Sequence, residues 1–168
     1  MGVYSIWLML EQDSRSSYRD LIIKLSKKLK TPSFDPHCTL YGRLDLNIDQ
    51  IRPTVIELVK TNKQFSTNVK RLKTGKTKWK SLYLALDNNE DLEYLYNECK
   101  NKFGSLRKYA FDPHLSIAYG IFDPESIHYA TKNIKIPEYL SFSAIAIVKT
   151  GENIVDWEIV FQRQFENG

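Results

Sequence analysis

Two short stretches of this chain are nearly identical, and each carries a histidine. Residues 34–40 read FDPHCTL, and residues 111–117 read FDPHLSI. In both copies a hydroxyl residue stands two positions after the histidine, and an aliphatic residue follows the hydroxyl. A repeat of this length and chemistry is not expected by chance in 168 residues. The sequence therefore predicts an internal duplication in which each half contributes one histidine and one hydroxyl.

Each copy of the repeat has the pattern of a β-strand. Proline fixes its own φ and biases the preceding Asp toward extended conformations. Because alternate side chains of a strand share a face, His37 and Thr39 point to one side of the first copy. His114 and Ser116 do the same in the second. Two such strands related by an approximate twofold would bring both imidazoles and both hydroxyls around one cleft.

This set of side chains suits phosphate ester chemistry. Neutral imidazole can take a proton from water and imidazolium can give one to a leaving oxygen, because the unperturbed pKa of about 6.5 makes both forms accessible. Hydroxyls can donate hydrogen bonds to the non-bridging phosphate oxygens. A lone histidine is more often structural, but two of the three in this chain occupy matching positions. We therefore interpret His37 and His114 as catalytic, and Thr39 and Ser116 as phosphate-binding.

Paired H-x-[ST]-hydrophobic motifs, one in each half of a chain near this length, resemble those of the two-histidine (2H) phosphoesterase superfamily. The similarity is greatest to its plant-type cyclic phosphodiesterases. It extends to the opening strand VYSIWLML, a turn at Thr74-Gly75, the HLSIAY segment and the late strand with VDWEIV. The resemblance implies hydrolysis of nucleoside 2′,3′-cyclic phosphates or of ADP-ribose 1″,2″-cyclic phosphate, without a metal or other cofactor.

The resemblance also implies that Trp7 and Tyr119 contact the substrate. On the residues alone, Trp7 belongs either to the core or to the cleft. Strict alternation places Tyr119 on the face opposite His114, so a substrate contact requires a bulge or a strand end near Gly120.

Composition limits the class of protein. With 24 basic and 20 acidic residues the net charge is +4, which is mild for a nucleic-acid binder and suits an anionic substrate. Two cysteines do not make a disulfide framework. No apolar run approaches the roughly 20 residues of a membrane span, and the N-terminus lacks a secretory pattern. We expect a cytoplasmic monomer with no membrane partner.

Hydrophobic periodicity predicts alternating strands and helices. Helices are expected at 14–30, 49–62, from about residue 88, and after Asp123-Pro124; strands at 3–10, 37–44, 65–86 as a pair, 114–120, 139–149 and 154–164. We predict an α+β fold of two pseudo-twofold-related lobes, each a small antiparallel sheet with outer helices, around a central cleft. These lobes would form one intertwined domain over residues 1–168. A parallel doubly wound sheet is disfavoured because no Gly-rich strand-to-helix loop is present.

Several residues near the motifs permit two interpretations. Tyr41 could line the cleft or pack across strands. Asp35 and Asp112 could orient the imidazoles, but we expect them to bond backbone in the turn. The basic segment KRLKTGKTKWK could be an arm that stacks a base, but we interpret it as an exposed hairpin and leave Lys76, Lys78 and Trp79 out of the site.

Three functions from different classes remain open. The first is metal-independent hydrolysis of a small cyclic phosphate nucleotide. The second is cleavage of RNA ends or 2′,5′-linked oligonucleotides by the same four residues. The third is a non-catalytic nucleotide-binding module. A metal site is disfavoured because neither motif histidine has a second histidine or carboxylate at ligand spacing. Near-symmetry of the copies leaves open which histidine is acid and which is base.

Overall fold

The structure is a computed structural model that describes residues 2–166. In this range the strands are β1 Gly2–Leu10, β2 His37–Leu46, β3 Phe65–Thr77, β4 Lys80–Leu86, β5 His114–Ala118, β6 Tyr139–Lys149 and β7 Glu158–Gln164. The helices are α1 Gln12–Leu29, α2 Ile48–Thr61, α3 Glu90–Phe103 and α4 Pro124–Thr131, with a short 3₁₀ helix at Ile154–Asp156. None of these helices is long and apolar enough to cross a membrane.

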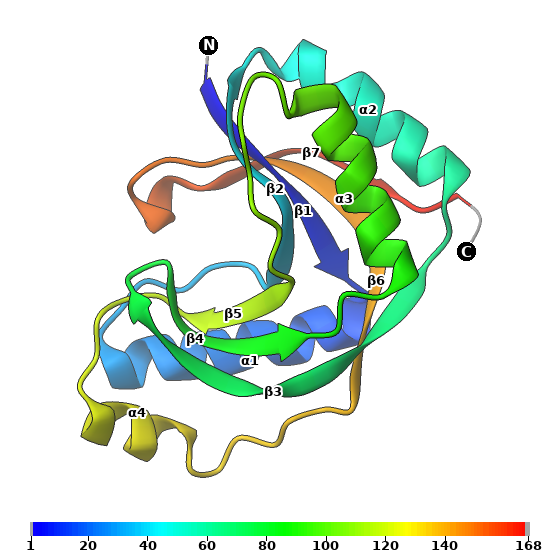
Figure 1. Ribbon diagram of the computed structural model, residues 1–168. Coiled ribbons are helices and arrows are strands. Elements are labelled where there is room, and N and C mark those ends of the chain that lie inside the picture. The colour runs from blue at the N-terminus through cyan, green and yellow to red at the C-terminus, as the bar shows by residue number, and fades with distance from the viewer. Residues whose placement is uncertain (1, 167–168) are drawn as a thin grey trace.

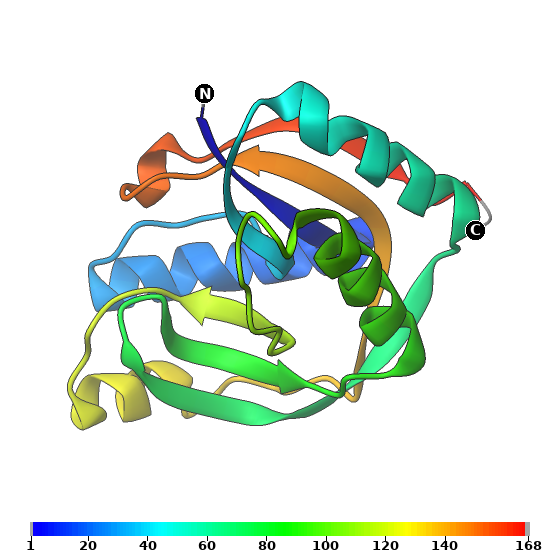
Figure 2. The same ribbon diagram turned by 45° about the horizontal axis from the view of Figure 1, so that its top comes forward.

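The strands form one antiparallel sheet in the order β2-β1-β6-β3-β4-β5, with β7 paired to β6 (Figure 1). We call β2, β1, β6 and β7 the first lobe, and β3, β4 and β5 the second. The start of β3 pairs with the start of β6, so the sheet is continuous between the lobes (Figure 2). The predicted α+β class with antiparallel pairing is confirmed.

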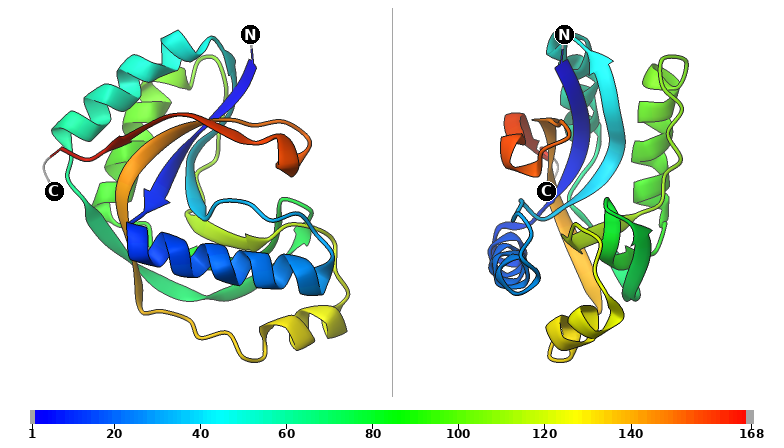
Figure 3. Two further views of the ribbon diagram at one scale, coloured as in Figure 1. Left: turned by 180° about the vertical axis from the view of Figure 1, so that it is seen from behind. Right: turned by 90° about the vertical axis from the view of Figure 1, so that its left-hand side faces the viewer.

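The two lobes exchange elements. In the first lobe β1 and β2 pair, and in the second β4 and β5 pair. The third strand of each lobe comes from the other half of the sequence, because β6 joins β1 and β3 joins β4. Helices cross over as well: α1 packs against β5 and α3 packs against β2 (Figure 3). The duplication in the sequence therefore does not give two separate halves.

The apolar faces of the two motif strands lie in the main core, as alternation predicts. The core side chains of these strands are fully buried: Cys38, Leu40, Leu115 and Ile117. On β1 the same core takes Ile6, Leu8 and Leu10, while Trp7 and Met9 join a smaller cluster on the other face of the sheet. The side chains of His37 and His114 are thereby directed away from the main core.

A bulge in β2 decides the position of Tyr41. Opposite β1, Thr39 pairs with Trp7 and Tyr41 pairs with Ile6, which leaves Leu40 as an extra residue. An extra residue shifts the alternation by one, so Tyr41 turns into the core. It is fully buried there, and its hydroxyl donates to the main-chain oxygen of Arg107 at 2.5 Å. Tyr41 does not line the cleft.

The predicted turn at Thr74-Gly75 is wrong. Strand β3 continues to Thr77, and the turn falls at residues 78–79. Gly75 lies instead at a register irregularity, where an added Cβ would collide with the Lys80 main-chain oxygen. The glycine is needed for close approach of two backbones and not for the turn itself. As a result Trp79 stands at the tip of the hairpin.

Replacing Gly75 by alanine should destabilise the protein. The added methyl meets a backbone oxygen that cannot move aside without breaking the hairpin register, and overpacking of this kind costs about 1–3 kcal/mol. The free energy of unfolding from urea denaturation measures the effect. Gly151→Ala is the matched control, because a Cβ there meets nothing within 4 Å. Equal stability of the two variants would contradict this account of Gly75.

Candidate active site

A cavity of about 240 Å³ contains five of the six predicted site residues on its walls. These are Trp7, His37, Thr39, His114 and Tyr119. Larger hollows of about 390 and 470 Å³ lie beside α1 and α2, and neither is lined by a predicted site residue. Strand β1 contributes Trp7, β2 contributes His37 and Thr39, and β5 contributes His114. The motif strands of both lobes thus meet at this cavity.

The two imidazoles are anchored in the same way. Nδ1 of His37 lies 2.6 Å from the main-chain oxygen of Asp35, and Nδ1 of His114 lies 2.6 Å from that of Asp112. A carbonyl oxygen only accepts, so each Nδ1 carries the proton and donates it. Nε2 is then the nitrogen of each ring that is left to exchange a proton with a ligand.

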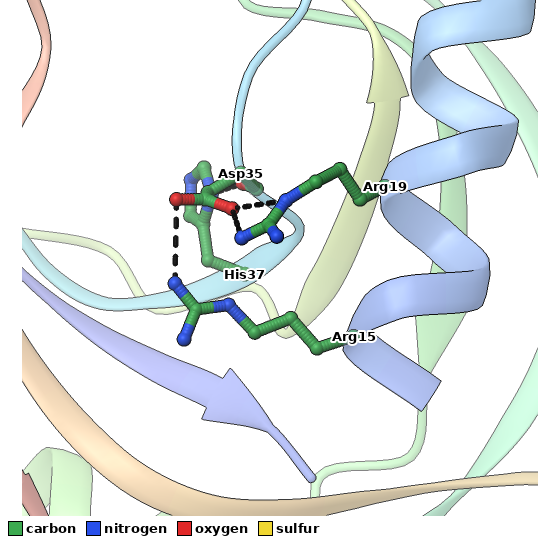
Figure 4. A network of polar contacts seen from close by, with 4 residues as sticks. All are labelled: Arg15, Arg19, Asp35 and His37. Atoms are coloured by element: carbon green, nitrogen blue, oxygen red, sulfur yellow. Dashed lines mark hydrogen bonds and ion pairs between the residues drawn. The ribbon is translucent and has the colours of Figure 1, made fainter. Parts of the chain in front are cut away.

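The carboxylates of the two aspartates pair with cations and not with backbone in the turn. Asp35 accepts from Arg19 Nε at 3.0 Å and from Arg15 Nη2 at 3.3 Å, both on α1 (Figure 4). Asp112 pairs with Lys80 on β4. Burial alone would raise the pKa of Asp35, but the two guanidinium groups together hold it below its usual value. The predicted turn bonding is wrong: the aspartates fix the imidazoles through main-chain oxygens, and ion pairs tie their side chains to neighbouring elements.

The environments of the two histidines differ. His37 is 3% exposed, and its ring stacks on Trp7 at 3.4 Å between centroids and an interplanar angle of 5°. Burial lowers the pKa of His37 to about 3; the bond to Asp35 opposes this, and the charge of His114 lowers it further. Burial disfavours a charged imidazole when no counter-charge is near. At neutral pH His37 therefore rests in the neutral form.

His114 is the less buried of the pair. It meets the ring of Tyr83 edge-on at 5.3 Å. Burial lowers the pKa of His114 as well, the bond to the Asp112 main-chain oxygen opposes this, and the charge of Lys80 adds to the lowering. Because His114 keeps more contact with solvent, it is the more readily protonated of the two. The two histidines are therefore not equivalent, although their sequence motifs are nearly identical.

The two predicted phosphate-binding hydroxyls also differ. Thr39 lines the cavity, whereas Ser116 is 2% exposed and does not line it. The Oγ of Ser116 has no hydrogen-bond partner among residues 2–166. Ser116 lies near the phenol of Tyr119 and partly offsets the rise that burial causes in its pKa, but the two hydroxyls do not have hydrogen-bond geometry. In this structure Thr39, and not Ser116, is open to a ligand in the cavity. A buried hydroxyl without a partner costs about 1–3 kcal/mol, which a ligand oxygen bonded to Ser116 would remove.

Tyr119 reaches the cavity because β5 ends just before it. The last strand residue is Ala118, and Gly120 follows with a φ of 148°, in the region that favours glycine. The Tyr119 ring packs on Phe34 with 4.2 Å between centroids, and burial raises the pKa of its phenol to about 12. Tyr119 could contact a substrate only if the strand bulged or ended near Gly120, and the strand ends there.

Eight further residues line the cavity that sequence reasoning did not place there, and the four with the largest side chains are Arg43, Trp79, Tyr109 and Trp157. A turn at Thr74-Gly75 would leave Trp79 inside a strand, whereas the later turn carries it to the cavity. The only signal for Trp157 was its place in the VDWEIV segment. Arg43 adopts a φ of 59° after the β2 bulge, and Tyr109 lies in the loop before β5, so neither position follows from strand alternation.

The site offers neither a cluster of metal ligands nor a reactive thiol. Within residues 2–166, histidine, cysteine, aspartate and glutamate side chains do not gather in a group of three or more that could hold a metal ion. Cys38 and Cys99 are buried free thiols, and burial raises the pKa of each to about 12. Neither thiol supplies a thiolate near neutral pH.

Comparison with known proteins identifies the family. Residues 32–153 match the sequence model of the 2′-5′ RNA ligase superfamily. A cyclic phosphodiesterase of Arabidopsis thaliana is 26% identical over 117 residues, which are 70% of this chain. The matched region spans 65% of that relative's own length.

Solved structures show the same fold. Escherichia coli LigT in complex with 3′-AMP superimposes with a TM-score of 0.62 at 11% identity, over 98% of each chain. TT0787 of Thermus thermophilus gives a TM-score of 0.64 at 12% identity, again over 98% of each chain. The family match covers most of the sequence and includes both histidine motifs. The chain therefore belongs to the 2′-5′ RNA ligase superfamily, the two-histidine phosphoesterases.

Proposed function

We propose that the protein hydrolyses small cyclic phosphodiesters without a metal. The substrate is a nucleoside 2′,3′-cyclic phosphate or ADP-ribose 1″,2″-cyclic phosphate. The observation that carries the proposal is the matched anchoring of His37 and His114, each through Nδ1, on the walls of one cavity. Similarity to an Arabidopsis cyclic phosphodiesterase supports the substrate class.

In this mechanism the oxygen of a water attacks phosphorus while one P–O bond of the ring breaks. Nε2 of His37 takes the proton of the attacking water, because this imidazole rests neutral. Nε2 of His114, the more readily protonated ring, gives a proton to the departing ribose oxygen. Thr39 and Ser116 donate to the non-bridging oxygens, where charge is held during displacement. The product is a phosphomonoester with one free hydroxyl.

A panel of 2′,3′-cyclic nucleotides and ADP-ribose 1″,2″-cyclic phosphate tests the proposal directly. Incubation with excess chelator should still give turnover, and phosphorus NMR identifies which ester bond breaks. If the folded protein turns over none of these substrates, the proposed hydrolysis is wrong. Binding without turnover would instead favour the non-catalytic nucleotide-binding module.

A second candidate is cleavage of RNA ends or 2′,5′-linked oligonucleotides by the same residues. The family's name favours it, since that name refers to 2′-5′ linkages in RNA. Salt separates the two candidates. An oligonucleotide that contacts the protein through several phosphates loses affinity steeply as salt rises, whereas a mononucleotide loses little. A shallow dependence of KM on salt for every active substrate supports the mononucleotide site.

Loss of either phosphate-binding hydroxyl should lower activity. Thr39→Ala and Ser116→Ala should each reduce kcat/KM by about a hundredfold, because a donor to the developing charge is lost. Thr39→Ser should have a mild effect because it keeps the donor. Steady-state kinetics measure the activity of each variant. Tyr119→Phe shows how much activity depends on the nearby phenol, so that this effect is not attributed to Ser116. Near-full activity of both alanine variants in folded protein would refute the phosphate-binding role.

A further inference from the structure

Two indoles from opposite lobes meet at the mouth of the active-site cavity. Trp79 stands in the turn between β3 and β4, and Trp157 lies between the 3₁₀ helix and β7. Figure 1 shows both connections on the same side of the molecule, where the lobes diverge. Both side chains line the cavity and both are only partly buried. Loops of this kind often carry binding residues on a rigid scaffold.

The two rings are oriented for stacking. Their centroids lie 6.0 Å apart and their planes differ by 19°. Tyr119 stands edge-on to both, at 5.9 Å from Trp79 and 5.7 Å from Trp157. Trp157 also lies 6.2 Å from the imidazole of His37. A phosphate held at His37 would therefore leave the rest of its nucleoside beside these aromatic faces.

The surroundings fix the loop of Trp157 and place a cation beside Trp79. The indole nitrogen of Trp157 donates to the main-chain oxygen of Gly151 at 3.1 Å, which closes the loop on itself. Nζ of Lys78 lies 4.7 Å from the centre of the Trp79 ring. A base stacked on these rings would meet aromatic faces with positive charge nearby.

Two hydroxyls of the cavity wall are engaged with each other. The hydroxyls of Ser5 and Thr150 both line the cavity, but they bond to each other at 3.0 Å. Ser5 Oγ also accepts from the main-chain nitrogen of Arg43 at 3.1 Å. Stacking tolerates any base because every base has a π-face. Stacking on these rings therefore favours an aromatic base with little preference among bases.

We infer that Trp79 and Trp157 form a base-stacking clamp that selects cyclic phosphates carrying an aromatic base, with little preference among bases. This inference rests on the proposed function, and it names the substrate feature that the same site recognises. The clamp is built from both lobes, since one indole belongs to the β3–β4 hairpin and the other to the β6–β7 connection. It is a specificity device, distinct from the histidines that move protons.

Kinetics with and without a base test the clamp. The substrates are the 2′,3′-cyclic phosphates of adenosine, guanosine, cytidine and uridine, and ribose 2,3-cyclic phosphate. Wild-type kcat/KM should be similar for the four nucleosides and at least about tenfold lower for the ribose compound. Trp79→Ala and Trp157→Ala should each raise KM for the nucleosides about tenfold with a much smaller change in kcat. Their effect on the ribose compound should be much smaller.

Substitution by phenylalanine at either position should restore most of the lost affinity, because a stacking face returns. Tyr94→Ala is the matched control, since it removes an exposed aromatic ring on α3, outside the cavity. Equal losses on nucleoside and ribose substrates would overturn the clamp and assign the indoles to packing of the loops. No loss at all would overturn it as well.

Failure of the proposed function can be distinguished from failure of the clamp. If wild-type protein hydrolyses none of the five compounds, calorimetric titration with 3′-AMP and with inorganic phosphate replaces kinetics. The clamp then predicts that both alanine variants lose about tenfold in affinity for 3′-AMP and much less for phosphate. Unchanged affinity for 3′-AMP in both variants would overturn it.

Discussion

His37→Ala and His114→Ala should each lower kcat/KM for cyclic phosphate hydrolysis by about 10²–10⁴-fold, the usual contribution of a positioned acid or base. The double variant should be little worse than either single one. The two imidazoles serve one displacement, and the loss of groups that act as a unit is not additive. Steady-state rates of the three variants, with circular dichroism to check folding, measure this. Multiplicative losses would show that the histidines act independently.

Leaving-group chemistry assigns the two roles. A phosphodiester with a nitrophenolate leaving group does not need a proton from the enzyme, so it should restore activity to the variant that lacks the general acid. The environments predict that this variant is His114→Ala, because His114 is the less buried imidazole. Rescue of His37→Ala instead would reverse the assignment. Full loss of wild-type activity with chelator, restored by a divalent ion, would refute the mechanism.

Much of the architecture follows from the sequence because periodicity and turn residues agree along most of the chain. All four expected helices are present, and both ends of α1 and α2 and the start of α3 lie within about two residues of the predicted positions. The motif strands point their apolar residues into the core as alternation requires. The positions of His37, Thr39 and His114 around one cavity therefore follow from local pattern and from duplication.

The features that local pattern misses depend on interactions between distant segments. The extra residue in β2 is set by pairing with β1, so alternation misplaces Tyr41. Gly75 reads as a turn residue, but its role is to let β3 approach Lys80. The exchange of β6 into the first lobe has no local signal, because β6 and β1 lie far apart in the sequence, whereas the β3–β4 hairpin is predicted from residues 65–86. Trp157 reaches the site only through this exchange, since β6 leads into its loop.

The ion pairs of Asp35 and Asp112 also depend on segments that are distant in the sequence. A turn aspartate most often bonds local backbone, and nothing near Asp35 or Asp112 in sequence indicates otherwise. Arg15 and Arg19 come from α1, and Lys80 comes from β4, each on a different element from its aspartate. These partners come from tertiary packing and cannot be predicted from the residues next to each aspartate.

Burial of His37 should make the stability of the protein depend on pH up to about 6.5, above the range where ordinary carboxylates titrate. The pKa of this imidazole is about 3 in the folded protein and about 6.5 in an unfolded chain. Between these values the unfolded chain binds a proton at His37 and the folded protein does not. Protons therefore favour unfolding, and the free energy of unfolding falls as pH is lowered through this window, by at most about 1.4 kcal/mol per pH unit.

Urea denaturation at pH 6.5, 5.5 and 4.5 measures the effect, and His37 alone should account for a fall of about 2 kcal/mol across that range. His114 acts in the same direction, because burial lowers its pKa as well. Asp35 stays ionised in this window since the arginines hold its pKa below the usual value, so its ion pairs are kept.

The variant His37→Asn isolates the contribution of this imidazole. Its amide can still donate to the Asp35 main-chain oxygen, but it does not titrate, so its stability should fall much less with pH than that of the wild type. An unchanged pH dependence in His37→Asn would mean that His37 accepts a proton in the folded protein as easily as in the unfolded chain. The neutral resting state assigned to it as a base would then be wrong.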